Sequence, residues 1–279
     1  MRRLLLALAA SLVASGALAQ EVWQTLPEPP AMPAPAESGM APVNDIEMYY
    51  AVYGEGEPVM LIHGGLGHAD VWGFQVPALA ADHKVIVADS RGHGRSTRSE
   101  QPFGHELMAS DYLALLDHLG IDRVALVGWS DGGIIGLDIA IRHPDRLSAL
   151  YAFAANYVPE GVKETVGADP VFGAYIERAS ADYARLSPTP DEFDAFVEQI
   201  SQMWAGQPHY SKEQLRAIPV RTVIFSGEHD EAIKLEHTRE MAELIPNARL
   251  EIMPDASHFA MWQHPDAFNA SVLAFLAGK

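Results

Sequence analysis

Three side chains that could together carry out acyl transfer are scattered along the sequence: Ser130, Asp230 and His258. Serine is a poor nucleophile near neutral pH, so it needs a base to take its proton, and the base needs an acid to orient it. Histidine and aspartate supply these two roles. We therefore predict a nucleophile–base–acid triad in which Ser130 attacks an acyl carbon, His258 transfers the proton and Asp230 holds the imidazole.

Ser130 lies in a Gly-x-Ser-x-Gly motif between a predicted strand and a predicted helix. The apolar run 124–127 is typical of a buried strand, and residues 134–140 follow a helical pattern. In so tight a turn a Cβ at either flanking position would collide with neighbouring backbone, which explains Gly128 and Gly132. The motif predicts a nucleophile elbow that holds Ser130 Oγ at the carboxyl end of a sheet.

The predicted base and acid follow two later strands. The predicted strand 221–225 leads into the loop that contains Asp230, and the predicted strand 249–253 leads into the loop that contains His258. Because the carboxyl ends of parallel strands meet at one edge of a sheet, both loops should emerge beside Ser130.

Acyl transfer also needs two backbone N–H groups that stabilise the developing oxyanion. One is expected from Asp131, at the start of the helix after Ser130. The second is expected from the loop after the strand 59–62, where Gly65 and Leu66 are alternative donors. His63, in the same loop, is predicted to order the loop rather than to carry a proton.

The side chains next to the predicted triad have two interpretations each. The carboxylate of Asp131 either stabilises the helix N-terminus or borders the pocket and favours a substrate that bears an amine. Trp129 and Phe259 are expected to contact the substrate, with core packing as the alternative.

Composition limits the classes of protein and of partner. The chain has 279 residues, 48% of them hydrophobic, which is enough for one sizeable core. Its formal charge of −18 argues against nucleic acid or an anionic membrane as a partner. The absence of cysteine excludes disulfides and thiol catalysis, and no zinc-binding histidine motif is present. No cofactor and no metal are expected.

The N-terminus has the features of a secretory signal peptide over residues 1–19. Two arginines precede an apolar run, and Ala17-Leu18-Ala19 supplies a small-x-small cleavage site. We expect export to the periplasm or the medium. Residues 20–42 are rich in proline and lack periodicity, and they are predicted to be a linker outside the fold.

From residue 43 to residue 279 short apolar runs alternate with helical patterns, which predicts one α/β domain with a parallel sheet covered on both faces. The alternation stops between about 156 and 218. That segment is helical in pattern and rich in aromatic residues, so it is predicted to be a cap above the carboxyl ends of the strands.

Several motifs resemble, in type and order, those of the α/β-hydrolase superfamily. They are His63-Gly64-Gly65, Asp89-x-Arg91-Gly92-x-Gly94-x-Ser96, Gly128-Trp129-Ser130-Asp131-Gly132-Gly133, Gly227-x-x-Asp230 and Ser257-His258. The chain order serine, aspartate, histidine is also the order of the superfamily's triad. The resemblance implies an α/β-hydrolase fold, with a mostly parallel central sheet, flanking helices and a helical cap inserted after the sixth strand. It places the acid at Asp230 rather than at Glu228.

The form Gly-Trp-Ser-Asp-Gly-Gly is similar to that of valacyclovir-hydrolase-like esterases. The resemblance therefore implies a serine hydrolase whose partner is a small acyl substrate, namely a carboxylic ester, a lactone or an activated amide. The same fold also hosts cofactor-free haloperoxidases, C–C bond hydrolases and binding proteins with little turnover, and these are the alternatives.

Overall fold

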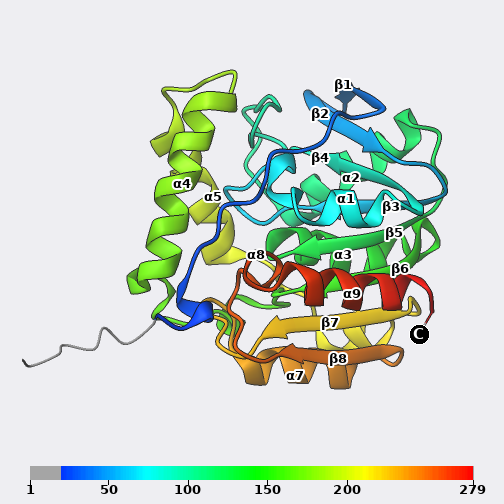
Figure 1. The fold of residues 1–279 in the computed structure, drawn as a ribbon, viewed down its shortest axis with the longest axis vertical. Helices are drawn as coiled ribbons and strands as arrows, with labels where there is room; N and C mark the ends of the chain where they lie inside the picture. Colours follow the sequence, from blue (N-terminus) through cyan, green and yellow to red (C-terminus); the bar gives the residue numbers. More distant parts are fainter. Residues whose placement is uncertain (1–19, 279) are drawn as a thin grey trace, which may run out of the picture.

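The part of the chain that the computed structural model describes, residues 20–278, is built on one eight-stranded sheet (Figure 1). The predicted signal peptide, residues 1–19, lies outside the described residues, so export stays a prediction. Within the described part, no helix combines the length and the apolar character that crossing a membrane requires.

The central sheet is mostly parallel, as predicted. Its order is β1-β2-β4-β3-β5-β6-β7-β8; β1 and β2 run antiparallel to their neighbours, and β3 to β8 all run parallel to one another. The strands are β1 (Glu37–Val43), β2 (Ile46–Tyr53), β3 (Glu57–Ile62), β4 (His83–Ala88), β5 (Val124–Trp129), β6 (Leu147–Phe153), β7 (Thr222–Gly227) and β8 (Ala248–Met253).

Helices cover the sheet on both faces (Figure 1). The helices are α1 (Gln75–Leu79), α2 (His105–His118), α3 (Asp131–Arg142), α4 (Pro170–Leu186), α5 (Phe193–Gly206), α6 (Lys212–Arg216), α7 (Leu235–Leu244), α8 (Ala260–Gln263) and α9 (Pro265–Leu276). In Figure 1, α1 and α9 lie in front of the sheet and α3 lies behind it.

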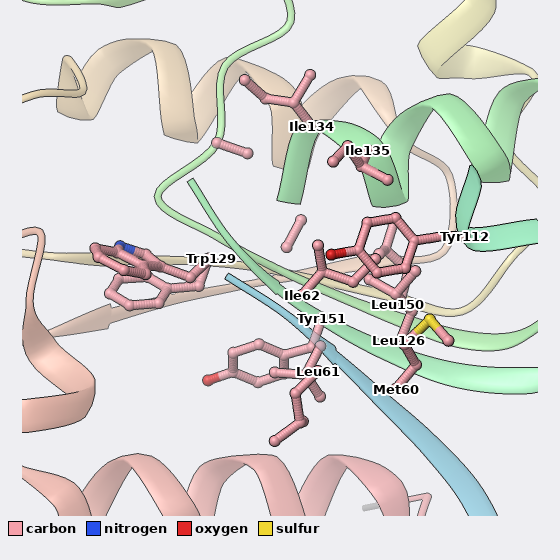
Figure 2. Packing of buried hydrophobic residues seen from close by; sticks show 14 of the residues in the cluster. Met60, Leu61, Ile62, Tyr112, Leu126, Trp129, Ile134, Ile135, Leu150 and Tyr151 are labelled. Carbon is pink, nitrogen blue, oxygen red and sulfur yellow. The ribbon is translucent and has the colours of Figure 1, made fainter. Parts of the chain in front are cut away.

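The alternation of side chains along the strands explains why both faces are apolar. Leu126 pairs in register with Leu150, and both lie on the face of α3, where Gly136 leaves them room. The next residue, Tyr151, lies on the opposite face, and its ring packs 5.8 Å from that of Phe268 in α9 (Figure 2). Strands buried in this way have continuous apolar sequences, which is why they could be predicted.

The segment between β6 and β7 forms a helical cap that contains α4 and α5. The helix α4 begins where the side chain of Asp169 accepts the backbone N–H groups of Val171 and Phe172, with Pro170 in the first turn. In Figure 1, α4 and α5 lie beside the arrowheads of β5, β6 and β7, at the carboxyl edge of the sheet.

The prediction that residues 20–42 form a linker outside the fold is wrong. Residues 37–43 are strand β1, fully paired with β2, and Leu26 and Met32 pack against the core. The backbone carbonyl groups of this segment accept hydrogen bonds from the side chains of Arg178 and Gln263. Proline has no backbone N–H group but keeps its carbonyl group. A proline-rich segment can therefore pack on the domain through its carbonyl groups, without a periodic pattern of apolar side chains.

The run from Asp89 to Ser96 is a mostly buried turn. Arg91 is fully buried and binds both carboxylate oxygens of Asp111 at 2.8 Å, together with Asp45 and Ser99. This bidentate pair ties the turn to α2.

We expect Asp111→Ala to lower the free energy of unfolding by about 3–5 kcal/mol, because it leaves the buried guanidinium of Arg91 without its main partner. The matched control is Asp117→Ala, which removes an exposed partner of Arg146 on the same helix and should cost at most about 1 kcal/mol. Urea unfolding measures both. Equal losses in the two variants would contradict the assignment.

Candidate active site

The link from β5 to α3 is a single residue, Ser130, with backbone angles (φ 54°, ψ −118°) that few residues other than glycine adopt. A Cβ on Gly128 would lie 2.2 Å from the carbonyl oxygen of Gly132, and one on Gly132 would lie 2.1 Å from that of Ile62. Only glycine fits at both positions. The strand–serine–helix turn predicted from the motif is therefore present.

The loop after β3 is ordered by a neutral histidine. Nε2 of His63 accepts the N–H of Ser90 at 2.9 Å, so it carries no proton, and Nδ1 then donates to the carbonyl of Gly64 at 2.7 Å. Burial lowers the pKa of His63 to about 4, which keeps the ring neutral. These contacts match the structural role predicted for His63.

Of the three predicted oxyanion donors, Asp131 follows Ser130 directly, and a Cβ on Gly65 would lie 2.7 Å from Oδ2 of Asp131. Leu66 has a positive φ of 62°, and the carbonyl of Gly65 accepts the hydroxyl of Tyr175 at 2.8 Å. The amides of Gly65 and Leu66 donate no hydrogen bond to any described residue, and Asp131 is the first residue of α3, where the helix offers no acceptor. All three amides are thus available to a ligand.

The loops after β7 and β8 bring Asp230 and His258 together. Nδ1 of His258 lies 3.0 Å from Oδ1 of Asp230 and 3.2 Å from Oδ2, and both side chains are buried. The carboxylate is oriented by the N–H groups of Ala232 and Ile233 and by the hydroxyl of Ser226. The imidazole therefore faces a carboxylate whose position is set by its own loop.

The charges in this pair shift both pKa values. Burial alone would raise the pKa of Asp230 and lower that of His258. The mutual attraction and the hydrogen bond outweigh burial, so the pKa of Asp230 lies below its usual value and the pKa of His258 lies above it. The pair consequently favours an ionised carboxylate and a more basic imidazole.

Ser130 and His258 share two neighbours, Trp129 and Phe153. The indole of Trp129 donates to the carbonyl of His258 at 2.9 Å, and the ring of Phe153 lies 6.4 Å from the imidazole. The N–H of Ser130 in turn donates to the carbonyl of Phe153 at 2.7 Å. Ser130 Oγ makes no hydrogen bond to the described residues, as is common for a nucleophile before its substrate binds.

The structure does not place Trp129 and Phe259 on a wall that a substrate could touch. They are 1% and 0% exposed, and Phe259 stacks on Trp262 with ring centroids 5.4 Å apart. Trp129 meets both of these rings edge-on. A ring without accessible surface cannot contact a ligand unless the core repacks, so the packing alternative describes both residues.

The carboxylate of Asp131 binds the cap. The indole N–H of Trp204, in α5, donates to it at 2.9 Å, and Nε2 of His105 lies 3.3 Å from its other oxygen. Burial alone would raise the pKa of Asp131, but the hydrogen bonds and the charge of His105 outweigh it and lower the pKa. The two roles predicted for the Asp131 carboxylate, stabilising the helix N-terminus and bordering the pocket, did not include this contact with the cap.

Glu231 supports the histidine loop, and the sequence analysis did not single it out. Its Oε2 accepts the backbone N–H of His258 at 2.9 Å, and its Oε1 lies 3.4 Å from the hydroxyl of Ser257. Burial raises the pKa of Glu231 to about 7. In the sequence it is one more acidic residue beside Asp230, and only the folded chain shows that it is buried.

Two other acidic residues near the site lie on the surface. Glu228, the less favoured candidate for the acid, and Asp255, in the loop after β8, are both exposed. Together with His229 they place three potential ligand atoms within 4.8 Å of one another. Exposed carboxylates keep their hydration, so proximity alone does not make this group a metal site.

A cavity of about 310 Å³ lies beside the predicted oxyanion loop. Leu66, Gly67 and Tyr175 line it, together with residues 28–32 and the polar side of α4. Ser130, Asp230 and His258 do not line it. The cavity therefore adjoins the loop but is not the space directly over the serine.

Comparisons with known proteins agree with this fold. The sequence pattern of the alpha/beta hydrolase family matches residues 59–271. RutD from Caulobacter sp. (strain K31), named as a carbamate hydrolase, is 30% identical over 83% of this chain and 96% of its own.

Two solved structures are similar as well. CumD, a meta-cleavage product hydrolase from Pseudomonas fluorescens IP01, has a TM-score of 0.76 and 25% identity over 88% of this chain and 98% of its own. An enol-lactonase from Burkholderia xenovorans LB400 has a TM-score of 0.69 and 27% identity over 86% of this chain and 100% of its own. The chain belongs to the alpha/beta hydrolase family, and it is a hydrolase.

Glu231 should make stability depend on pH. Its pKa is about 7 when folded, against an ordinary value of 4.5, so the folded protein keeps a proton that the unfolded chain loses between these pH values. Stability should therefore fall as pH rises from 4.5 to 7. In Glu231→Gln this decline should be absent, and the variant should gain about 3 kcal/mol relative to wild type across that range.

Denaturant unfolding from pH 4 to pH 8 measures this difference. Glu228→Gln, at an exposed position in the same loop, is the matched control. If Glu231→Gln and wild type lose stability in parallel over the range, the assignment of this proton is wrong.

Proposed function

We propose that this hydrolase cleaves a small carboxylic ester, a lactone or an activated amide through an acyl-enzyme formed on Ser130. The observation that carries the proposal is the buried hydrogen bond between Asp230 and His258, in loops next to the elbow that presents Ser130. The likeness to an enol-lactonase and to a relative named as a carbamate hydrolase supports acyl chemistry.

In the proposed mechanism, Ser130 Oγ attacks the acyl carbon while Nε2 of His258 takes its proton. Asp230 holds the Nδ1–H and stabilises the imidazolium. The oxyanion of the tetrahedral intermediate receives the N–H of Asp131 and that of Gly65 or Leu66. His258 then protonates the leaving group, and a water molecule, activated by the same base, releases the acid from the serine.

A second candidate is the hydrolysis of a carbon–carbon bond by the same triad. The likeness to a meta-cleavage product hydrolase, with a TM-score of 0.76, favours it. The two candidates share Ser130, Asp230 and His258 but differ in the substrate, so a substrate panel separates them.

We expect Ser130→Ala to lower kcat on p-nitrophenyl esters and lactones by on the order of 10⁴-fold or more, because no other group on the elbow can form the acyl-enzyme. Ser148→Ala, at an exposed position in β6, is the control and should keep wild-type rates. Full activity in Ser130→Ala would overturn the mechanism. Turnover of a meta-cleavage product, with none of the esters or lactones, would favour the second candidate.

The rate should also follow the protonation of His258, which must be neutral to accept the serine proton. Because Asp230 raises the pKa of His258 above 6.5, kcat/KM should fall as pH drops, with a midpoint above pH 6.5. Asp230→Asn removes the charge, so the midpoint should move to lower pH and kcat should fall by on the order of 10⁴-fold. Profiles of kcat/KM from pH 4.5 to 9 test this. An unmoved midpoint would exclude Asp230 as the partner.

A further inference from the structure

Residues 20–36, here called the N-terminal arm, lie against both the cap and the loops of the candidate triad. Figure 1 shows the arm in dark blue, running between α4 and α8. Its first turn is the short 3-10 helix Val22–Gln24, and the rest is extended. It therefore lies against α4 of the cap and against α8.

Gln263 connects the arm to the histidine loop. Its Nε2 donates to the carbonyls of Thr25 at 2.8 Å and Trp23 at 3.2 Å, and to the hydroxyl of Ser257 at 2.9 Å. Its Oε1 accepts the backbone N–H of Ser257 at 2.8 Å. One nearly buried side chain thus holds the arm and the residue that directly precedes His258.

The arm has two further anchors. The ring of Trp23 stacks on that of His229 with centroids 4.5 Å apart, which places the arm on the loop of Asp230. The guanidinium of Arg178, in α4, donates to the carbonyls of Leu26 and Pro27 and pairs with Glu28. The arm consequently contacts the acid loop, the histidine loop and the cap.

Two side chains hold the histidine loop in addition to Trp129, which donates to the carbonyl of His258. Glu231 accepts the N–H of His258 from the side of the acid loop, and Gln263 binds both the N–H and the hydroxyl of Ser257 from α8. Without the arm, the amide group of Gln263 loses two carbonyl acceptors and can turn away from Ser257. A displacement of about 1 Å in a reacting group can cost on the order of 10²-fold in rate.

We propose that the N-terminal arm, acting through Gln263, is a positioning element that fixes the loop of His258 for catalysis. This proposal rests on the proposed function of His258 as the base. It assigns a catalytic consequence to a segment that lies more than 200 residues before His258 in the chain. Neither the arm nor Gln263 touches the substrate in this role.

The test uses Gln263→Met, which keeps the length of the side chain and removes its hydrogen bonds. The matched control is Gln75→Met. Gln75 is also a buried glutamine that donates to a carbonyl of α8, that of Met261, but it contacts neither the arm nor the histidine loop. We expect Gln263→Met to lower kcat by about tenfold or more with KM changed less than threefold, and Gln75→Met to keep wild-type kcat.

A second variant, lacking residues 20–25, removes the partners of Gln263 and leaves Gln263 itself in place. This shortened variant tests the proposal on its own if Gln263→Met does not fold. Combined with Gln263→Met it should lower kcat no further than the more severe single change, because both act through the same contact. Independent effects that multiply, or wild-type kcat in both variants, would overturn the proposal.

The rate at which diethyl pyrocarbonate modifies His258, followed by mass spectrometry, gives a readout that needs no turnover. Loosening of the loop should raise this rate in Gln263→Met and in the shortened chain, but not in Gln75→Met. If wild type shows no turnover that depends on Ser130, the proposed function fails, and the modification rates still report on the arm. Unchanged modification with normal turnover would exclude the arm as a positioning element.

Discussion

A buried carboxylate must accept hydrogen bonds from the protein around it. The arrangement of the candidate site depends on how the donors around Asp230 are placed. Two backbone N–H groups from the loop after β7, the hydroxyl of Ser226 at the end of β7 and the imidazole from the loop after β8 surround it. The carboxyl edge of the parallel sheet brings these loops together. The same edge ends β5, where the strained turn at Ser130 directs the hydroxyl out of the sheet. The strained turn at Ser130 and the irregular loops that carry Asp230 and His258 thus lie where the chemistry is proposed.

The sequence predicted the elements whose physical signal is local. Strands β5 and β7 are buried along their whole length because both faces of the sheet are covered. The elbow is visible because only glycine fits at positions 128 and 132, two residues before and two residues after Ser130. The chain order of Ser130, Asp230 and His258, with each residue after a strand, led to the prediction that they meet at one edge of the sheet. The structure joins two of them directly and gives the third the same neighbours.

The features that were missed depend on contacts between distant segments. The N-terminal arm is held through its backbone carbonyl groups, which bind side chains that lie more than 150 residues away. Because every residue type has a carbonyl group, such contacts leave no periodic pattern in the sequence. Glu231 could not be distinguished from a solvated acid, and Trp129 and Phe259 could not be distinguished from pocket walls, until their burial was visible. Burial of a single side chain is a property of the whole fold, so a short stretch of sequence carries little information about it.

The contact between Trp204 and Asp131 has a consequence for which molecules can enter. In the proposed mechanism Asp131 gives its N–H to the oxyanion, while its carboxylate accepts the indole N–H of Trp204 in α5 of the cap. A substrate that displaces Trp204 from Asp131 would leave the carboxylate with His105 as its remaining side-chain partner. Such a displacement would disfavour a large anionic substrate, because the carboxylate of Asp131 repels its charge.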